Sequence, residues 1–180
     1  YINDHSLSSR RLRTFANAAS TPRTVFDIST SQLKRLIISY RAHYTSSAYS
    51  ILWHTALIYV ANELLENTQD QDWYSYLLLC LSGYGRLSRS WRVAKAISKG
   101  LLSMAMKRGD MSSSTAYGIL NALEHSGADQ LPGEIRATFM LDLERARSEP
   151  TTSTVEYLAQ QFEDNSMLSD YTNIFEKDLN

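Results

Sequence analysis

The fold is decided by one stretch of the chain, which reads Ile51-Leu52-Trp53-His54-Thr55-Ala56-Leu57-Ile58-Tyr59-Val60-Ala61-Asn62-Glu63-Leu64-Leu65. It has no glycine or proline and is long enough for about four helical turns. A step of about 100° per residue places large apolar side chains nearly all round this helix, between a few polar positions at Thr55, Asn62 and Glu63. A helix that is apolar on most sides must be covered on most sides. We therefore expect the central helix of an all-α domain, either a multi-helix bundle or an irregular helical array.

The overall composition fits one domain with a sizeable core. The chain has 180 residues, of which 43% are hydrophobic and 21% charged, and its net charge of −1 argues against a nucleic-acid footprint spread over the whole domain. Cys80 is the only cysteine, which excludes an internal disulfide and a cysteine-based metal cluster and fits a reducing compartment. No apolar run approaches the roughly 20 residues of a membrane helix, so we expect no membrane partner. The first residue is Tyr1, and we expect a fragment of a longer protein.

Composition divides the chain into three parts. Residues 1–30 are a basic, Ser/Thr-rich lead-in, for which we expect a solvated arm with one short helix near residues 8–18, in preference to a nuclear-localisation signal at Arg10, Arg11 and Arg13. Residues 31–165 carry the helical pattern and are predicted to form the domain itself. Residues 166–180 are an acidic and aromatic C-terminal segment, which is either docked on the domain or not ordered by itself.

Apolar periodicity and boundary signals predict the individual helices. The expected ranges are residues 31–43, 51–67, 73–82, 88–108, 113–126 and 132–147, and one more helix after residue 153. The boundary signals are an N-cap at Ser29 or Ser31, a turn or kink at Thr45–Ser47, a stop at Gly83 and Gly85, a left-handed residue at Gly109, a cap at Asp110 or Ser112, an end at Gly127, a first turn at Pro132, and a capping box formed by Ser153 and Glu156. Core positions are expected at Leu33, Leu36, Ile37, Tyr40, Val93, Ile97, Leu101, Met104, Tyr117, Leu120, Leu123, Ile135, Phe139, Leu143, Ala146, Val155, Leu158 and Phe162.

The residues that could carry chemistry form no pattern that points to catalysis. His43 and His54 lack a third ligand at a metal spacing, so we expect them to pack between helices. Cys80 lies in an apolar helix, where a thiol is usually inert. Glycine-rich phosphate loops and a nucleophile elbow are missing from the sequence. We expect no enzyme, and no catalytic, cofactor-binding or metal-binding residues in this segment.

Two surface features leave alternatives open. Arg92, Lys95 and Lys99 lie on one side of the helix predicted over residues 88–108, and we expect a solvated face in preference to a phosphate contact. The three tryptophans and eleven tyrosines favour ordinary core packing over a small-molecule cavity between helices, although both remain open.

The stretch Trp53-His54-Thr55-Ala56-Leu57-Ile58-Tyr59 resembles the aromatic-His-x-Ala-x-Ile-Leu helix in the middle regulatory region of fungal binuclear zinc-cluster transcription factors. The segments that follow, Tyr76-Leu77-Leu78-Leu79-Cys80-Leu81, Tyr84, Ser90-Trp91-Arg92-Val93-Ala94 and Gly100-Leu101-Leu102-Ser103-Met104-Ala105, are like its C-terminal part. The resemblance spans about residues 31–125, and the nitrate-assimilation type of regulator is the most similar subgroup.

The resemblance implies an all-α regulatory domain of a DNA-binding transcription factor, working in the nucleus. The zinc cluster that binds DNA would lie outside this segment, so DNA would be a partner only through that missing module. Where the family often has a His-Arg-Pro turn, this chain reads Val60-Ala61-Asn62-Glu63, so we expect the helix to continue. The implied partners are a transcriptional coactivator or another protein, and in some cases a metabolite.

The C-terminal segment holds the candidate protein-interaction residues. Tyr171, Ile174 and Phe175 are interleaved with acidic residues, a pattern that suits an amphipathic helix induced on a coactivator. A peptide packed against the core is the alternative. Other functions left open are a helical scaffold or adaptor unrelated to transcription, and a helical small-molecule-binding protein.

Overall fold

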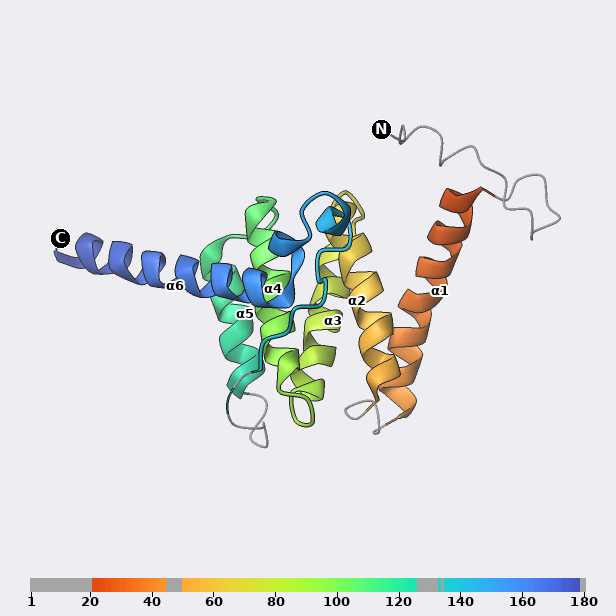
Figure 1. The fold of residues 1–180 in the computed structure, drawn as a ribbon. Coiled ribbons are helices and arrows are strands. Elements are labelled where there is room, and N and C mark those ends of the chain that lie inside the picture. The colour runs from red at the N-terminus through yellow and green to blue at the C-terminus, as the bar shows by residue number, and fades with distance from the viewer. Residues whose placement is uncertain (1–20, 45–49, 126–132, 134, 179–180) are drawn as a thin grey trace.

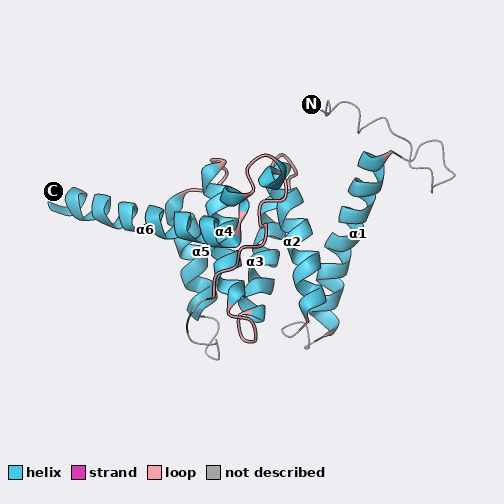
Figure 2. Ribbon diagram, viewed as in Figure 1, coloured by secondary structure: helices cyan, strands magenta, loops and turns pink. Residues whose placement is uncertain are grey.

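The structure is a computed structural model that describes residues 21–44, 50–125, 133 and 135–178, with side chains described as far as residue 168. Six α-helices lie in this part of the chain: α1 (Pro22–His43), α2 (Ile51–Glu66), α3 (Trp73–Leu87), α4 (Val93–Lys107), α5 (Ser113–His125) and α6 (Val155–Asp178), with short 3-10 helices η3 (Arg145–Arg147) and η4 (Thr151–Ser153). No strand is found among these residues, where the only β-type pairing is an isolated bridge between Met140 and Thr154 (Figure 2). The predicted all-α class is confirmed.

The helices form an irregular array. α1 packs on α2, α2 on α3, α3 on α4 and α4 on α5, while α6 makes its largest contact with α4. Figure 1 shows α1 at one edge, leaning away from α2 towards its N-terminal end, and α6 running across α4 and α5 and out beyond α5. An irregular segment (residues 135–144) passes over the array between α5 and α6.

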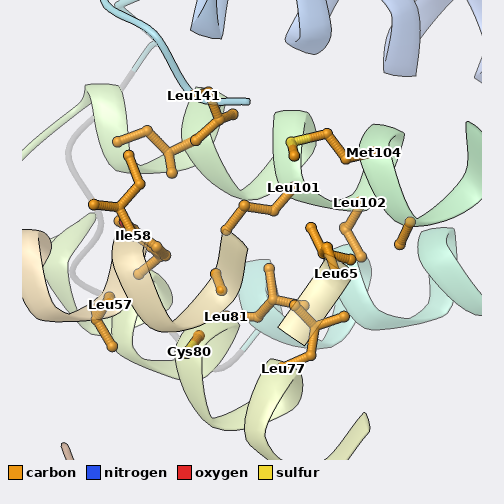
Figure 3. Close-up of a cluster of buried hydrophobic side chains, with 14 of the residues drawn as sticks. Leu57, Ile58, Leu65, Leu77, Cys80, Leu81, Leu101, Leu102, Met104 and Leu141 are labelled. Carbon is orange, nitrogen blue, oxygen red and sulfur yellow. The ribbon is translucent and has the colours of Figure 1, made fainter. Parts of the chain in front are cut away.

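One continuous apolar core joins α2, α3, α4 and the start of α6 (Figure 3). The stretch Ile51–Glu66 is confirmed as a helix that is buried along most of its surface, although Leu52 is 78% exposed and Tyr59 is half exposed. α4 is more fully enclosed, because small side chains let its neighbours approach closely. Its buried residues are Ala94, Ala96, Ile97, Ser98, Gly100, Leu101, Leu102, Ser103, Met104 and Ala105.

α1 begins earlier than its predicted start at residue 31, so the expected N-cap at Ser29 or Ser31 is wrong. Thr21 caps the helix instead, since its hydroxyl accepts the backbone N–H of Thr24 at 3.1 Å, and Pro22 follows as the first helical residue. Ile37 is fully buried as predicted, but Leu36 is exposed, because α1 has only one helix, α2, as a major packing partner.

Two ion pairs of Lys34 connect α1 to the array. Nζ of Lys34 lies 3.1 Å from Oε2 of Glu63 on α2 and 3.2 Å from Oδ2 of Asp70 in the following loop, which spans residues 67–72 as predicted. Burial lowers the pKa of Lys34, but these two carboxylates outweigh it and leave that pKa raised.

The predicted stop at Gly83 and Gly85 is also wrong, because α3 continues to Leu87. A Cβ at Gly83 would lie 2.8 Å from Cδ1 of Leu57, and one at Gly85 would lie 3.1 Å from Cδ2 of Leu123. These glycines therefore allow α3 to pack closely against α2 and α5, and they do not end the helix. Residues 88–92 then form a turn, so α4 begins later than expected.

The predicted boundaries around Gly109 are confirmed. Gly109 has a φ of +81°, the N–H of Asp110 bonds to the carbonyl oxygen of Ala105, and the N–H of Gly109 bonds to that of Met106. This is the hydrogen-bond pattern of a Schellman motif. Ser112 caps α5 as expected, since its hydroxyl accepts the N–H of Thr115 at 3.2 Å.

The largest correction concerns residues 132–147, which do not form the predicted helix. Pro132 lies outside the described residues, and residues 133 and 135–144 are irregular up to the start of η3. Ile135, Phe139 and Leu143 are partly exposed, while Leu141, which was not expected inside, is fully buried. Tertiary hydrogen bonds replace helical ones here: the N–H groups of Leu141 and Asp142 both bond to the carbonyl oxygen of Ser153. The helical spacing of the apolar residues in this segment was therefore not sufficient to produce a helix.

Two smaller expectations near α6 are wrong as well. Thr154 caps the helix through the N–H of Tyr157, while the Ser153 hydroxyl donates to the carbonyl oxygen of Glu149, so Ser153 and Glu156 form no capping box. Lys99 is not on a solvated face, because α6 lies beside it and its Nζ is 2.9 Å from Oε1 of Glu163.

The expected short helix at residues 8–18, the turn at residues 45–47 and the end at Gly127 lie outside the described residues. The division of the chain into three parts stays a prediction.

Candidate functional site

The predicted interaction residues Tyr171, Ile174 and Phe175 lie in the last part of α6. Their backbone is helical, and their side chains lie outside the described part of the structure. Figure 1 shows this C-terminal arm (residues 169–178) projecting beyond the array, and the preceding Met167 and Leu168 are both largely exposed. The arm is thus a helix that leaves the domain, and its role in binding stays a prediction.

A second site, which the sequence did not single out, is a pocket beside His54. It lies between α2, α3, α4 and the irregular segment, and its volume is about 90 Å³. Its walls are almost entirely carbon. They are formed by Ile51, His54, Tyr84, Leu87, Trp91, Val93, Ala94, Ile97 and Phe139.

A histidine–tyrosine pair forms the polar part of this His54 pocket. Nδ1 of His54 lies 3.1 Å from the hydroxyl oxygen of Tyr84, and the two rings meet edge to face at 5.8 Å. The ring of Phe139 makes a second edge-to-face contact with the ring of His54, with the two ring centroids 5.7 Å apart. Burial lowers the pKa of His54 and raises that of Tyr84 well above its usual value, so both groups are neutral near pH 7.

Ile51 and Phe139 are the most exposed of the lining residues, so we place the mouth of the pocket beside them. Phe139 is held there by its backbone, because its carbonyl oxygen accepts the N–H of Val155 at 3.1 Å. Asn62 fixes the same segment further along, through hydrogen bonds to Leu141 and Leu143. The pocket therefore depends on the packing of the irregular segment against α2 and α6.

The chemistry available at the pocket is that of apolar binding. No charged side chain belongs to its lining, and the hydroxyl of Tyr84 is already paired with His54. Cys80 is fully buried, and burial raises the pKa of its thiol to about 12, which makes the thiolate inaccessible at neutral pH. Among the described residues, no three His, Cys, Asp or Glu side chains are grouped so that they could hold a metal ion.

Three of the five segments quoted for the zinc-cluster resemblance contribute residues to this pocket. His54 comes from the first, Tyr84 is the isolated aromatic residue, and Trp91, Val93 and Ala94 come from the segment that follows. Sequence reasoning named these residues but did not bring them together. It also missed the role of Phe139, which it assigned to a helix core.

Comparison of the chain with models of protein families, with curated proteins and with solved structures found no match. The resemblance to zinc-cluster transcription factors therefore rests on the quoted sequence segments. In the described part of the chain, no helix combines the length and the apolar character that crossing a membrane requires.

Proposed function

We propose that the chain is a regulatory and protein-interaction domain of a fungal DNA-binding transcription factor that works in the nucleus. One observation carries the proposal: His54, Tyr84 and Trp91, which belong to separate segments of the resemblance, line one pocket although they come from α2, α3 and the turn before α4. Residues that define a family motif are expected to meet in space when they serve one purpose. Here they link the helices that form the middle of the array.

The proposed mode of action is the presentation of a surface. The C-terminal arm continues α6 away from the array and carries Tyr171, Ile174 and Phe175 beside acidic residues. An amphipathic helix that carries apolar anchors at helical spacing suits a groove on a partner protein. We propose a transcriptional coactivator as that partner. DNA would be bound by a zinc-cluster module elsewhere in the protein.

Two alternatives from other classes compete with this proposal. A helical scaffold or adaptor would use the same arm without any link to transcription. A helical small-molecule-binding protein is favoured by one specific observation, the apolar pocket beside His54.

The complete transcript tests the proposal without reference to any ligand. If the proposal holds, the coding sequence upstream of Tyr1 contains six cysteines at short regular spacing, followed by a basic linker. An open reading frame without such a cluster would contradict the proposal and favour the scaffold.

A further inference from the structure

We infer that the His54 pocket is a binding site for a small, uncharged, apolar molecule that is no larger than a single aromatic ring or a short branched hydrocarbon group. The inference rests on the pocket itself and does not depend on the proposed function. If the proposed function also holds, the pocket residues would bind a ligand within the regulatory domain, and the inference would then extend that function.

Size is the first argument. A water molecule needs roughly 10–15 Å³, and an engineered apolar cavity of about 150 Å³ in another protein holds benzene or xenon. The His54 pocket, at about 90 Å³, is larger than a packing defect and has room for a compact ligand, with its open mouth giving a little more space.

The lining decides the chemistry of that ligand. A buried water requires two to four polar partners, which an almost entirely carbon lining does not supply. The one polar pair, His54 and Tyr84, is internally hydrogen-bonded, so it gives a charged ligand no counter-ion. Trp91 and Phe139 supply ring surfaces, which favour a planar or branched apolar molecule.

The position of the pocket gives binding a structural consequence. A ligand there would contact α2, α3, α4 and the irregular segment at Phe139 together. A molecule that binds only the folded state stabilises that state by mass action. Occupation should therefore raise the melting temperature and tighten the segment that Phe139 belongs to.

The test uses the full chain and two probes of similar size, toluene and benzoate. We expect toluene to raise the melting temperature in a saturable way and to shift the NMR signals of the Val93 and Ile97 methyl groups. Benzoate, which is charged, should do neither at the same concentration. Absence of saturable toluene binding would overturn the inference, as would shifts confined to residues outside the pocket.

A pair of matched variants locates the site. Val93→Phe fills the pocket from its wall and should weaken toluene binding by roughly tenfold or more, because the ring would have no space left. Val25→Phe makes the same change at a half-buried position on α1 and should leave binding unchanged. Undiminished binding in Val93→Phe would contradict the inference. If Val93→Phe fails to fold, the methyl shifts of the wild-type chain decide. Binding of an aromatic peptide without any binding of free toluene would also overturn it, and would make the pocket a protein-anchor site.

Discussion

Asn62 on α2 holds Leu141 of the irregular segment through a buried side-chain amide. Its Nδ2 donates to the carbonyl oxygen of Leu141 at 2.9 Å, and its Oδ1 accepts the backbone N–H of Leu143 at 2.9 Å. Nδ2 also reaches the carbonyl oxygen of Ile58 one turn back, at 2.9 Å. The amide, which is only 5% exposed, thereby supplies hydrogen bonds that this segment does not obtain from a helix or sheet.

Replacement of Asn62 by alanine should destabilise the domain. The change leaves backbone groups of Leu141 and Leu143 without their partner, which costs about 1–3 kcal/mol when the groups are buried. Urea unfolding followed by circular dichroism measures the free energy of unfolding. Asn121→Ala, at an exposed position on α5, is the matched control and should change it by no more than about 0.5 kcal/mol. Equal effects of the two variants would show that the Asn62 amide does not stabilise the irregular segment.

Trp53 tests the buried character of α2. Its side chain is 4% exposed, and its ring lies 4.9 Å from that of Tyr40 on α1. Trp53→Ala should lower the free energy of unfolding by about 3–5 kcal/mol, because it removes a buried aromatic side chain. Leu52→Ala, one residue earlier on the exposed side, should cost less than about 0.5 kcal/mol. A loss below about 1 kcal/mol for Trp53→Ala would contradict an enclosed α2.

Much of the fold was predictable because local signals and packing agree. The helix at Ile51–Glu66 and the end of α4 just before Gly109 follow from sequence alone, through an unbroken apolar pattern and a glycine with positive φ. The helix end predicted at Gly83 was wrong, because the sequence does not distinguish a glycine that ends a helix from one that lets a neighbouring helix approach closely. The helix predicted over residues 135–147 was also wrong, because hydrogen bonds to Ser153 and Asn62 hold this segment in an irregular path despite its helical apolar spacing.

A pair of glycines separates backbone freedom from close packing. A Cβ at Gly100 would overlap Cδ2 of Leu141 and lie 3.3 Å from Cβ of Leu158, whereas nothing lies within 4 Å of one at Gly118. Gly118→Ala should therefore raise the free energy of unfolding by about 0.5–1 kcal/mol through helix propensity. Gly100→Ala should lower it by about 1–3 kcal/mol through overpacking. Thermal melts compare them, and a stabilised Gly100→Ala variant would mean that Leu141 moves aside freely.

His54 should give the domain a dependence on pH. Burial lowers its pKa in the folded state below the value of 6.5 expected in the unfolded chain. Its contribution is therefore fully present above pH 6.5 and declines as the pH falls towards the folded-state pKa, because the unfolded chain takes up the proton first. His54→Gln should flatten the loss of stability measured by urea unfolding from pH 7.5 downward. His43→Gln, at an exposed position on α1, is the control; a profile equally steep in His54→Gln and wild type would refute the assignment.

The candidate site was less predictable than the fold. Tyr84, Trp91 and His54 drew notice individually, but their convergence depends on how three elements pack, and a single sequence does not contain that distance. Phe139 could not have been assigned to the pocket, since its place follows from the irregular path of residues 135–144.

We have proposed that the C-terminal arm binds a transcriptional coactivator, and activation of transcription through this arm is the expected consequence. Its most direct test is a reporter assay in which the full chain is fused to an unrelated DNA-binding module. We expect activation by the wild type, reduced activation by Tyr171→Ala with Phe175→Ala, and unchanged activation by the matched pair Thr172→Ala with Asn173→Ala, all at the same melting temperature. Silence of the wild-type fusion, or full activity of the aromatic double variant, would contradict it; a lower melting temperature in that variant alone would instead indicate an arm packed on the domain.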